Sequence, residues 1–89
     1  MKTVILDGAE IACVGDVHRA FAAALQFPDW YGNNYDALFD LLTEPRGAVT
    51  VVLRHPALLE ETLGRRFRTL RHVLCAAAEE NPQIRIFEE

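Results

Sequence analysis

The sequence predicts an α/β fold, a three-stranded parallel sheet flanked by four helices in the order β-α-α-β-α-α-β. Three short segments rich in β-branched and apolar residues, 3–6, 49–53 and 84–87, have the character of strands. Between them lie segments whose apolar residues recur at helical spacing, two in each interval. Strands joined by helical crossovers pair in parallel, with right-handed connections. The 89 residues predict a single domain, 1–89.

The first half of the chain provides one strand and two helices. Residues 3–6 (TVIL) form the strand, and a helix follows the turn after it. Asp16 is the expected N-cap of this helix, and Pro28 ends it. Asn33 or Asn34 then caps the second helix, which runs to about residue 43.

The second half repeats this order. Residues 49–53 (VTVVL) are apolar on both faces of a strand, which indicates a central position in the sheet. After a loop at residues 44–47 and this strand, Pro56 opens a short helix that Gly64 closes. A longer helix is expected at residues 66–80, before the last strand.

The negative charge is concentrated in one segment. The net charge is −4, and residues 20–45 contain neither Lys nor Arg. The acids of this segment are Asp29, Asp36, Asp40 and Glu44. Without these four, the 13 acidic residues fall to nine, which equals the nine Lys and Arg elsewhere. Such a segment repels nucleic acid and attracts a cationic partner.

Asp36 and Asp40 are four residues apart on the second helix, a spacing that costs about 0.2–0.5 kcal/mol for like charges. An acid/base pair would need a cleft and two well separated pKa values. A metal site would need a third ligand at a recognisable spacing. A solvated polar face explains Asp36 near the helix N-terminus, but it does not explain Asp40. The aromatic residues around the pair are expected to form an exposed frame; they are Trp30, Tyr31, Tyr35 and Phe39. A protein-binding surface accounts for all of these residues together.

The cysteines, the histidine of the first helix and the basic cluster do not indicate a further functional site. Cys13 and Cys75 fit no metal spacing and are expected to be reduced and largely buried. His18 is expected to be a surface or helix-cap residue. The basic cluster Arg65, Arg66, Arg68, Arg71 and His72 is interpreted as a solvated helix face, with RNA or phosphate contact as the lesser alternative. We therefore expect no catalytic group, no cofactor and no metal ion.

The N-terminal MKTVILDG becomes polar too early for a secretory signal, and no apolar run approaches the roughly 20 residues that span a bilayer. These features predict a cytoplasmic protein that does not associate with a membrane.

Residues 16–42, DVHRAFAAALQFPDWYGNNYDALFDLL, resemble the barstar family of intracellular ribonuclease inhibitors. The specific part is a Pro-acid-aromatic-Tyr-Gly-x-Asn-x-Asp-Ala-Leu-aromatic-Asp pattern from Pro28 to Asp40. The resemblance implies the same three-stranded fold and a non-enzymatic protein. It also implies a 1:1 complex that blocks the active site of a small, basic, secreted ribonuclease, barnase-like or of a related guanyl-specific family. An adaptor that binds another basic protein through the same surface remains the alternative.

The resemblance also implies which residues touch the nuclease. They are Trp30, Asn34, Tyr35, Asp36, Ala37, Phe39, Asp40, Thr43 and Glu44. Asp40 would occupy the place of the RNA phosphate among the enzyme's Arg, His and Lys residues. The chain departs from the family pattern at Phe39, usually Trp, at Glu44-Pro45, usually Gly-Trp, and at Ala76, usually an interface Glu. These departures predict a related binding mode with a different or broader choice of nuclease.

Overall fold

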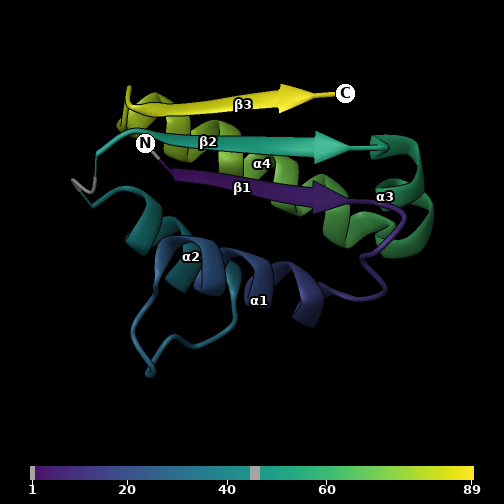
Figure 1. Ribbon diagram of the computed structural model, residues 1–89, viewed down its shortest axis with the longest axis horizontal. Helices are drawn as coiled ribbons and strands as arrows, with labels where there is room; N and C mark the ends of the chain where they lie inside the picture. Colours follow the sequence, from purple (N-terminus) through teal and green to yellow (C-terminus); the bar gives the residue numbers. More distant parts are fainter. Residues whose placement is uncertain (1, 45–46) are drawn as a thin grey trace.

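The computed structural model describes residues 2–44 and 47–89. Their elements follow the predicted order: β1 (Lys2–Asp7), α1 (Val14–Leu25), α2 (Tyr35–Leu42), β2 (Val49–Arg54), α3 (Pro56–Leu63), α4 (Arg65–Glu80) and β3 (Ile84–Glu88). The strands form one parallel sheet with β2 in the centre (Figure 1). The predicted fold class is therefore confirmed. The predicted loop at residues 44–47 includes residues 45 and 46, which lie outside the described residues.

The helices cover one face of the sheet and leave the other open. Because the strand order is β1-β2-β3, both right-handed crossovers turn to the same side. On the covered face the row Val4–Val51–Ile86 points toward the helices, and Val4 and Val51 are fully buried. The next row, Ile5–Val52–Phe87, points the other way, and Ile5 and Phe87 are 47% and 50% exposed. Strand β2 is central, as predicted, but only one of its two apolar faces is fully buried.

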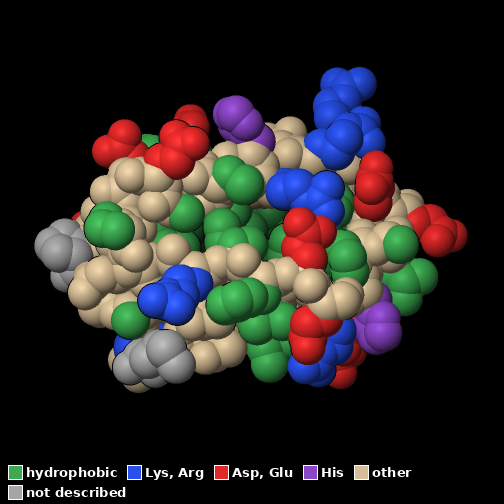
Figure 2. Space-filling view, turned by 90° about the horizontal axis from the view of Figure 1, so that it is seen from above, with side chains coloured by type: hydrophobic (Ala, Val, Ile, Leu, Met, Phe, Trp, Pro, Cys, Tyr) green, Lys and Arg blue, Asp and Glu red, His purple; other side chains and the backbone are tan. Residues whose placement is uncertain are grey.

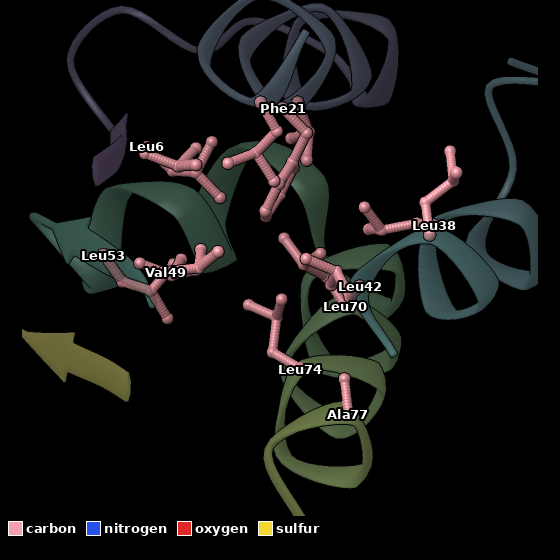
Figure 3. Close-up of a cluster of buried hydrophobic side chains, with 14 of the residues drawn as sticks. Leu6, Phe21, Leu38, Leu42, Val49, Leu53, Leu70, Leu74 and Ala77 are labelled. Atoms are coloured by element: carbon pink, nitrogen blue, oxygen red, sulfur yellow. The ribbon is translucent and has the colours of Figure 1, made fainter. Parts of the chain in front are cut away.

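The core lies between the sheet and the helices, and α2 is part of it. Figure 3 shows Phe21 of α1, Leu38 and Leu42 of α2, and Leu70 and Leu74 of α4 converging on the strand side chains. Burying a leucine side chain contributes roughly 1.5–3 kcal/mol. The inner side of the short helix α2 is thus held firmly, which fixes the direction of its outer side.

Two helix ends differ from the prediction. The N-cap of α1 is Cys13, and Asp16 lies inside the first turn. The Asp16 carboxylate still accepts a hydrogen bond from the N–H of Ala12 at 2.9 Å and pairs with Arg19. These two interactions, the Ala12 bond first, lower the pKa of Asp16. At the other end α1 stops before Pro28, with Gln26 in the left-handed conformation. Gly64 closes α3 as predicted, and α4 begins at Arg65, one residue earlier than expected.

Candidate functional site

The loop between α1 and α2 leads into a capped helix. In Figure 1 this loop projects beyond the sheet and returns to the start of α2. Asn34 is the N-cap, and its side-chain oxygen accepts a hydrogen bond from the N–H of Ala37 at 2.8 Å. Asn33 lies in the left-handed region (φ 53°), which asparagine tolerates better than most residues. Of the two predicted caps, Asn34 is therefore the one that serves, and the cap is worth about 1 kcal/mol.

The two sides of α2 differ as the sequence predicts. Leu38, Leu41 and Leu42 are buried against the core, while Asp36 and Asp40 are exposed on the opposite side. Ala37, Phe39 and Thr43 are partly buried along the flanks, and Glu44 is exposed just beyond the helix. The Thr43 hydroxyl donates to the Phe39 carbonyl at 2.9 Å and so helps to close the last turn. The helix thus holds both carboxylates in solvent, one turn apart.

The aromatic residues are less exposed than expected. Trp30 is 74% exposed and projects from the loop. Tyr35 is partly buried, and its hydroxyl donates to the backbone carbonyl of Arg66 on α4 at 2.8 Å. Phe39 is partly buried and packs against the core. Tyr31, expected in the same exposed frame, is buried, with 8% of its surface accessible. The exposed aromatic frame therefore reduces to Trp30 and the accessible parts of Tyr35 and Phe39.

His18 lies beneath this loop, which corrects the expectation of a surface or cap residue. It is 2% exposed, and its Nδ1 atom is 2.6 Å from the Tyr31 hydroxyl oxygen. Its ring also contacts Tyr31 and Tyr35, with centroids 5.6 and 5.5 Å away. Burial lowers the pKa of His18. Burial, with a smaller contribution from Tyr35, raises the pKa of Tyr31 to about 12. A neutral imidazole therefore links α1 to the loop that leads into α2.

The helical spacing of His18, Phe21 and Leu25 places all three on the buried side of α1. That spacing was present in the sequence and could have located His18. The polarity of the imidazole favoured the wrong interpretation, because histidine is intermediate in its tendency to be buried.

The charges of the loop and α2 have no counter-ions within the described part of the chain. No Lys, Arg or His nitrogen there lies within 4 Å of the carboxylates of Asp29, Asp36 or Asp40. With Trp30, these three acids form what we call the acidic surface. On the side of the molecule that carries β3, Figure 2 shows acidic and basic side chains next to one another on the right and a group of acidic side chains alone at the upper left. Exposed acids without a counter-ion among the described residues also occur at Glu79 and Glu80 of α4, so what distinguishes the acidic surface is the exposed Trp30 beside its carboxylates.

The cysteines and the basic cluster of the sequence analysis form no metal site among the described residues. Cys13 and Cys75 are free and exposed, so the prediction of buried thiols is wrong. In the basic cluster, Arg68 pairs with Glu60 at 3.5 Å and Arg71 pairs with Glu88. Among residues 2–44 and 47–89, no three His, Cys, Asp or Glu side chains are placed to hold a metal ion. None of the helices described combines the length and apolarity needed to cross a bilayer.

Two of the positions at which the chain departs from the family pattern are Ala76 and Pro45. Ala76 is partly buried on α4, with Glu79 and Glu80 exposed one turn further along. Pro45, the second residue of the Glu44-Pro45 departure, lies outside the described residues.

The arrangement suits contact with a cationic protein surface. The carboxylates stand on the solvent-exposed side of α2, and a surface hollow of about 330 Å³ is lined by Leu63, Arg65 and Arg66, not by Asp36 or Asp40. An acid/base pair needs an enclosed site that separates its two pKa values. Two carboxylates held in solvent one turn apart instead present negative charge to an approaching molecule.

Comparison with known proteins identifies the family. The family described as "Barstar (barnase inhibitor)" matches residues 1–88. The "Putative ribonuclease inhibitor YrdF" of Bacillus subtilis (strain 168) is 42% identical over 43 residues, which cover 48% of this chain and 47% of that protein. The match therefore spans about half the length of that relative. The family match extends over nearly the whole chain and includes the loop, the Asn34 cap and both aspartates of α2. The chain belongs to the barstar family.

Proposed function

We propose that this protein is a non-catalytic inhibitor of a small, basic, guanyl-preferring microbial ribonuclease. It binds the nuclease 1:1 through the acidic surface and the flanks of α2, and it blocks the active site. Family membership and the name of the Bacillus subtilis relative support inhibition of a ribonuclease. The observation that carries the choice of surface is the set of exposed carboxylates without counter-ions among the described residues, next to the exposed Trp30.

Asp40 is the residue that replaces substrate in this mechanism. An enzyme that cleaves RNA must hold a phosphodiester, so its active site presents cationic donors. A carboxylate accepts charge-assisted hydrogen bonds from such donors at about 2.7–2.9 Å. Asp40 stands on the exposed side of a helix whose inner side is fixed in the core, so it can enter a recessed site without rearrangement. It would thus occupy the phosphate position and exclude RNA.

The neighbouring residues would complete the contact. Asp36 would pair with a second cation one helical turn away from Asp40. Trp30, Tyr35 and Phe39 would bury aromatic area around the charges and exclude water from them. Asn34 already caps α2 through its side-chain oxygen and donates from its amide to the Gly32 carbonyl at 3.4 Å, so the second N–H of that amide would be available for the enzyme backbone.

Electrostatic steering would increase the rate at which the inhibitor and the nuclease meet. Attraction between the acidic surface and a basic nuclease accelerates association, and salt weakens it over a Debye length of about 8–10 Å. The best-known example of such steering is barnase with its inhibitor, a member of this same family, so it serves here as an analogy and not as a result for this chain.

Two free energies explain why a repulsive aspartate pair would be retained: its cost in the free helix and the cost of losing one carboxylate in the complex. Repulsion between Asp36 and Asp40 costs the free helix roughly 0.2–0.5 kcal/mol. Truncating one partner of a buried charge pair in a complex costs roughly 2–5 kcal/mol. Losing the carboxylate would therefore weaken the complex by several times what the repulsion costs the free protein, although this loss is not the net contribution of the pair.

The test is a titration of the protein into a fluorogenic RNA-cleavage assay with barnase and a panel of related guanyl-preferring ribonucleases. Asp40→Ala is compared with Glu61→Ala, which removes an equal charge from an exposed position on α3. We expect stoichiometric loss of nuclease activity with the wild type and Glu61→Ala, and little loss with Asp40→Ala. Equal inhibition by all three would move the binding surface away from α2. No inhibition of any nuclease would favour an adaptor that binds another basic protein.

A further inference from the structure

The start of α4 carries two cations that have no counter-ion within the described part of the chain. Arg65 and Arg66 are exposed, and no carboxylate of residues 2–44 and 47–89 lies within 4 Å of either guanidinium. Further along the same helix, Arg68 and Arg71 each have a carboxylate partner. Among the described residues, the arginines of α4 that lack a carboxylate partner are therefore the two in its first turn.

These two arginines line a hollow with Leu63. Its volume is about 330 Å³, and Leu63, which is itself 8% exposed, supplies an apolar part of the lining beside the two cationic side chains. A carboxylate on a short apolar stem matches this lining in charge and polarity, because two guanidinium groups can each donate to its oxygens. We call this feature the arginine hollow (Leu63, Arg65 and Arg66).

The arginine hollow adjoins the acidic surface. The Tyr35 hydroxyl at the start of α2 donates to the Arg66 carbonyl at 2.8 Å, and at the other end the Asn81 side chain donates to the Leu42 carbonyl at 3.1 Å. The two helices therefore run side by side in the same direction, with Arg66 next to the end that carries Tyr35 and Asp36. Burial raises the pKa of Tyr35, and the positive charge of Arg66 opposes that rise, so the guanidinium acts on the same hydroxyl.

We infer that the arginine hollow receives an aspartate or glutamate side chain of the ribonuclease, from the border of the active site that α2 covers. This inference rests on the proposed function. A bound nuclease would then meet negative charge at Asp36 and Asp40 and positive charge at Arg65 and Arg66. Nucleases with an acidic residue at that border would be favoured, and those with a basic residue there would be rejected by repulsion. The arginine hollow would therefore determine which ribonuclease is bound.

Charge reversal tests this inference by the sign of its effect. Arg66→Glu makes the protein more acidic, and with no local contact this alone would speed its association with a basic nuclease. The matched control is Arg85→Glu, the same change at an exposed position on the open face of the sheet. Dissociation constants and both rate constants are measured for each variant against barnase and the related nucleases, at about 0.15 M salt.

We expect Arg66→Glu to weaken binding to the best-inhibited nuclease by about tenfold or more, the change that 1.4 kcal/mol represents. Arg85→Glu should leave binding unchanged or slightly tighter. Replacing the acidic residues at the border of that nuclease's active site one at a time with lysine should identify one variant that restores affinity to Arg66→Glu. A significant coupling energy in that double-mutant cycle would identify the pair.

Folding does not obscure the result, because Tyr35 bonds to the backbone of Arg66 and a glutamate in the first turn of a helix is favourable. Thermal unfolding of each variant checks this. If the wild type inhibits a nuclease through Asp40 but Arg66→Glu behaves like Arg85→Glu, the inference is wrong and the proposed function stands. If no nuclease is inhibited, both fail. Binding of a single-stranded RNA oligonucleotide to the isolated protein, abolished by Arg66→Glu, would also overturn the inference.

Discussion

The outer side of α2 and the middle of α4, at Arg68 and Arg71, differ in how their exposed charges are paired. On α4, Arg68 and Arg71 are paired with Glu60 and Glu88 of adjacent elements. On α2, Asp36 and Asp40 have no counter-ion among the described residues, although the two helices lie side by side. Exposed ion pairs contribute only about 0–1 kcal/mol each and satisfy charges locally. Charges left unpaired are available to a partner, which is why the proposed function places the contact on the outer side of α2 and not at Arg68 or Arg71.

The largest expected effect is on nuclease binding, and its absence would contradict the comparison between the two helices. We expect Asp40→Ala to weaken nuclease binding by roughly 2–5 kcal/mol, because the cations it meets in the complex would be left unpaired. Glu60→Ala, which removes the partner of Arg68, should change binding by less than about 1 kcal/mol. Isothermal titration calorimetry measures both. Equal losses for the two variants would mean that pairing within the molecule does not distinguish the helices.

A second prediction concerns the cap that directs α2. Asn34→Ala should lower the free energy of unfolding by about 1 kcal/mol, because the N–H of Ala37 loses its acceptor. The control is Asn33→Gly, which should be nearly neutral because glycine adopts a positive φ freely. Urea denaturation measures both changes. A loss at Asn33 that matches the loss at Asn34 would show that the loop, and not the cap, sets the direction of α2.

A third prediction is a modest pH dependence from His18. Burial lowers its pKa in the folded state, so the neutral imidazole stabilises the fold above the unfolded-state pKa of about 6.5. As the pH falls from about 6.5 toward the lower folded pKa, the unfolded state binds a proton that the folded state does not, and this stability is lost. Thermal unfolding from about pH 7.5 to 5 should show the decline in the wild type.

The control for this prediction is His18→Gln, which cannot titrate in this range. Its stability should decline less steeply with falling pH than that of the wild type. Parallel curves for the two proteins would assign the pH dependence to other groups.

The smallest effect sharpens the comparison between the helices. Asp40→Asn should raise the stability of the free protein by roughly 0.2–0.5 kcal/mol at low salt, because it removes repulsion from Asp36. Added salt should reduce this gain through screening. Glu60→Gln should instead be neutral or slightly destabilising, because it weakens the pair with Arg68. Denaturation at low and high salt measures both, and a loss of stability in Asp40→Asn would reveal a structural role for that carboxylate.

Local patterns in the sequence predicted the elements well. The β-branched runs became β1, β2 and β3, and the leucines of α2 face inward while its aspartates face solvent. Side-chain burial away from these strong patterns was harder to predict. Cys75 lies between Leu74 and Ala76 on the outer side of α4, where helical periodicity places it, but the general preference of cysteine for burial suggested otherwise.

The candidate site was predictable in part for a similar reason. Asp36, Asp40 and Trp30 are close in sequence, so their proximity follows from one loop and one helix. Arg66 is 31 residues from Tyr35, and only the packing of α4 against α2 brings them together. The contact of His18 with Tyr31 likewise depends on how the loop returns over α1. Contacts made by tertiary packing leave no local signal.

The position of Leu38 and Leu42 in the central core has a practical consequence for finding the natural target. Because α2 belongs to the same core as α1 and α4, a protein bound to its outer side would stabilise the described fold as a unit. Free nuclease at about 100 times the dissociation constant would add roughly 2.7 kcal/mol to the free energy of unfolding. Each kcal/mol raises the melting temperature of a domain this small by about 4–8 °C. A melting curve recorded with each purified nuclease would therefore rank candidate targets, including nucleases whose RNA substrate is unknown.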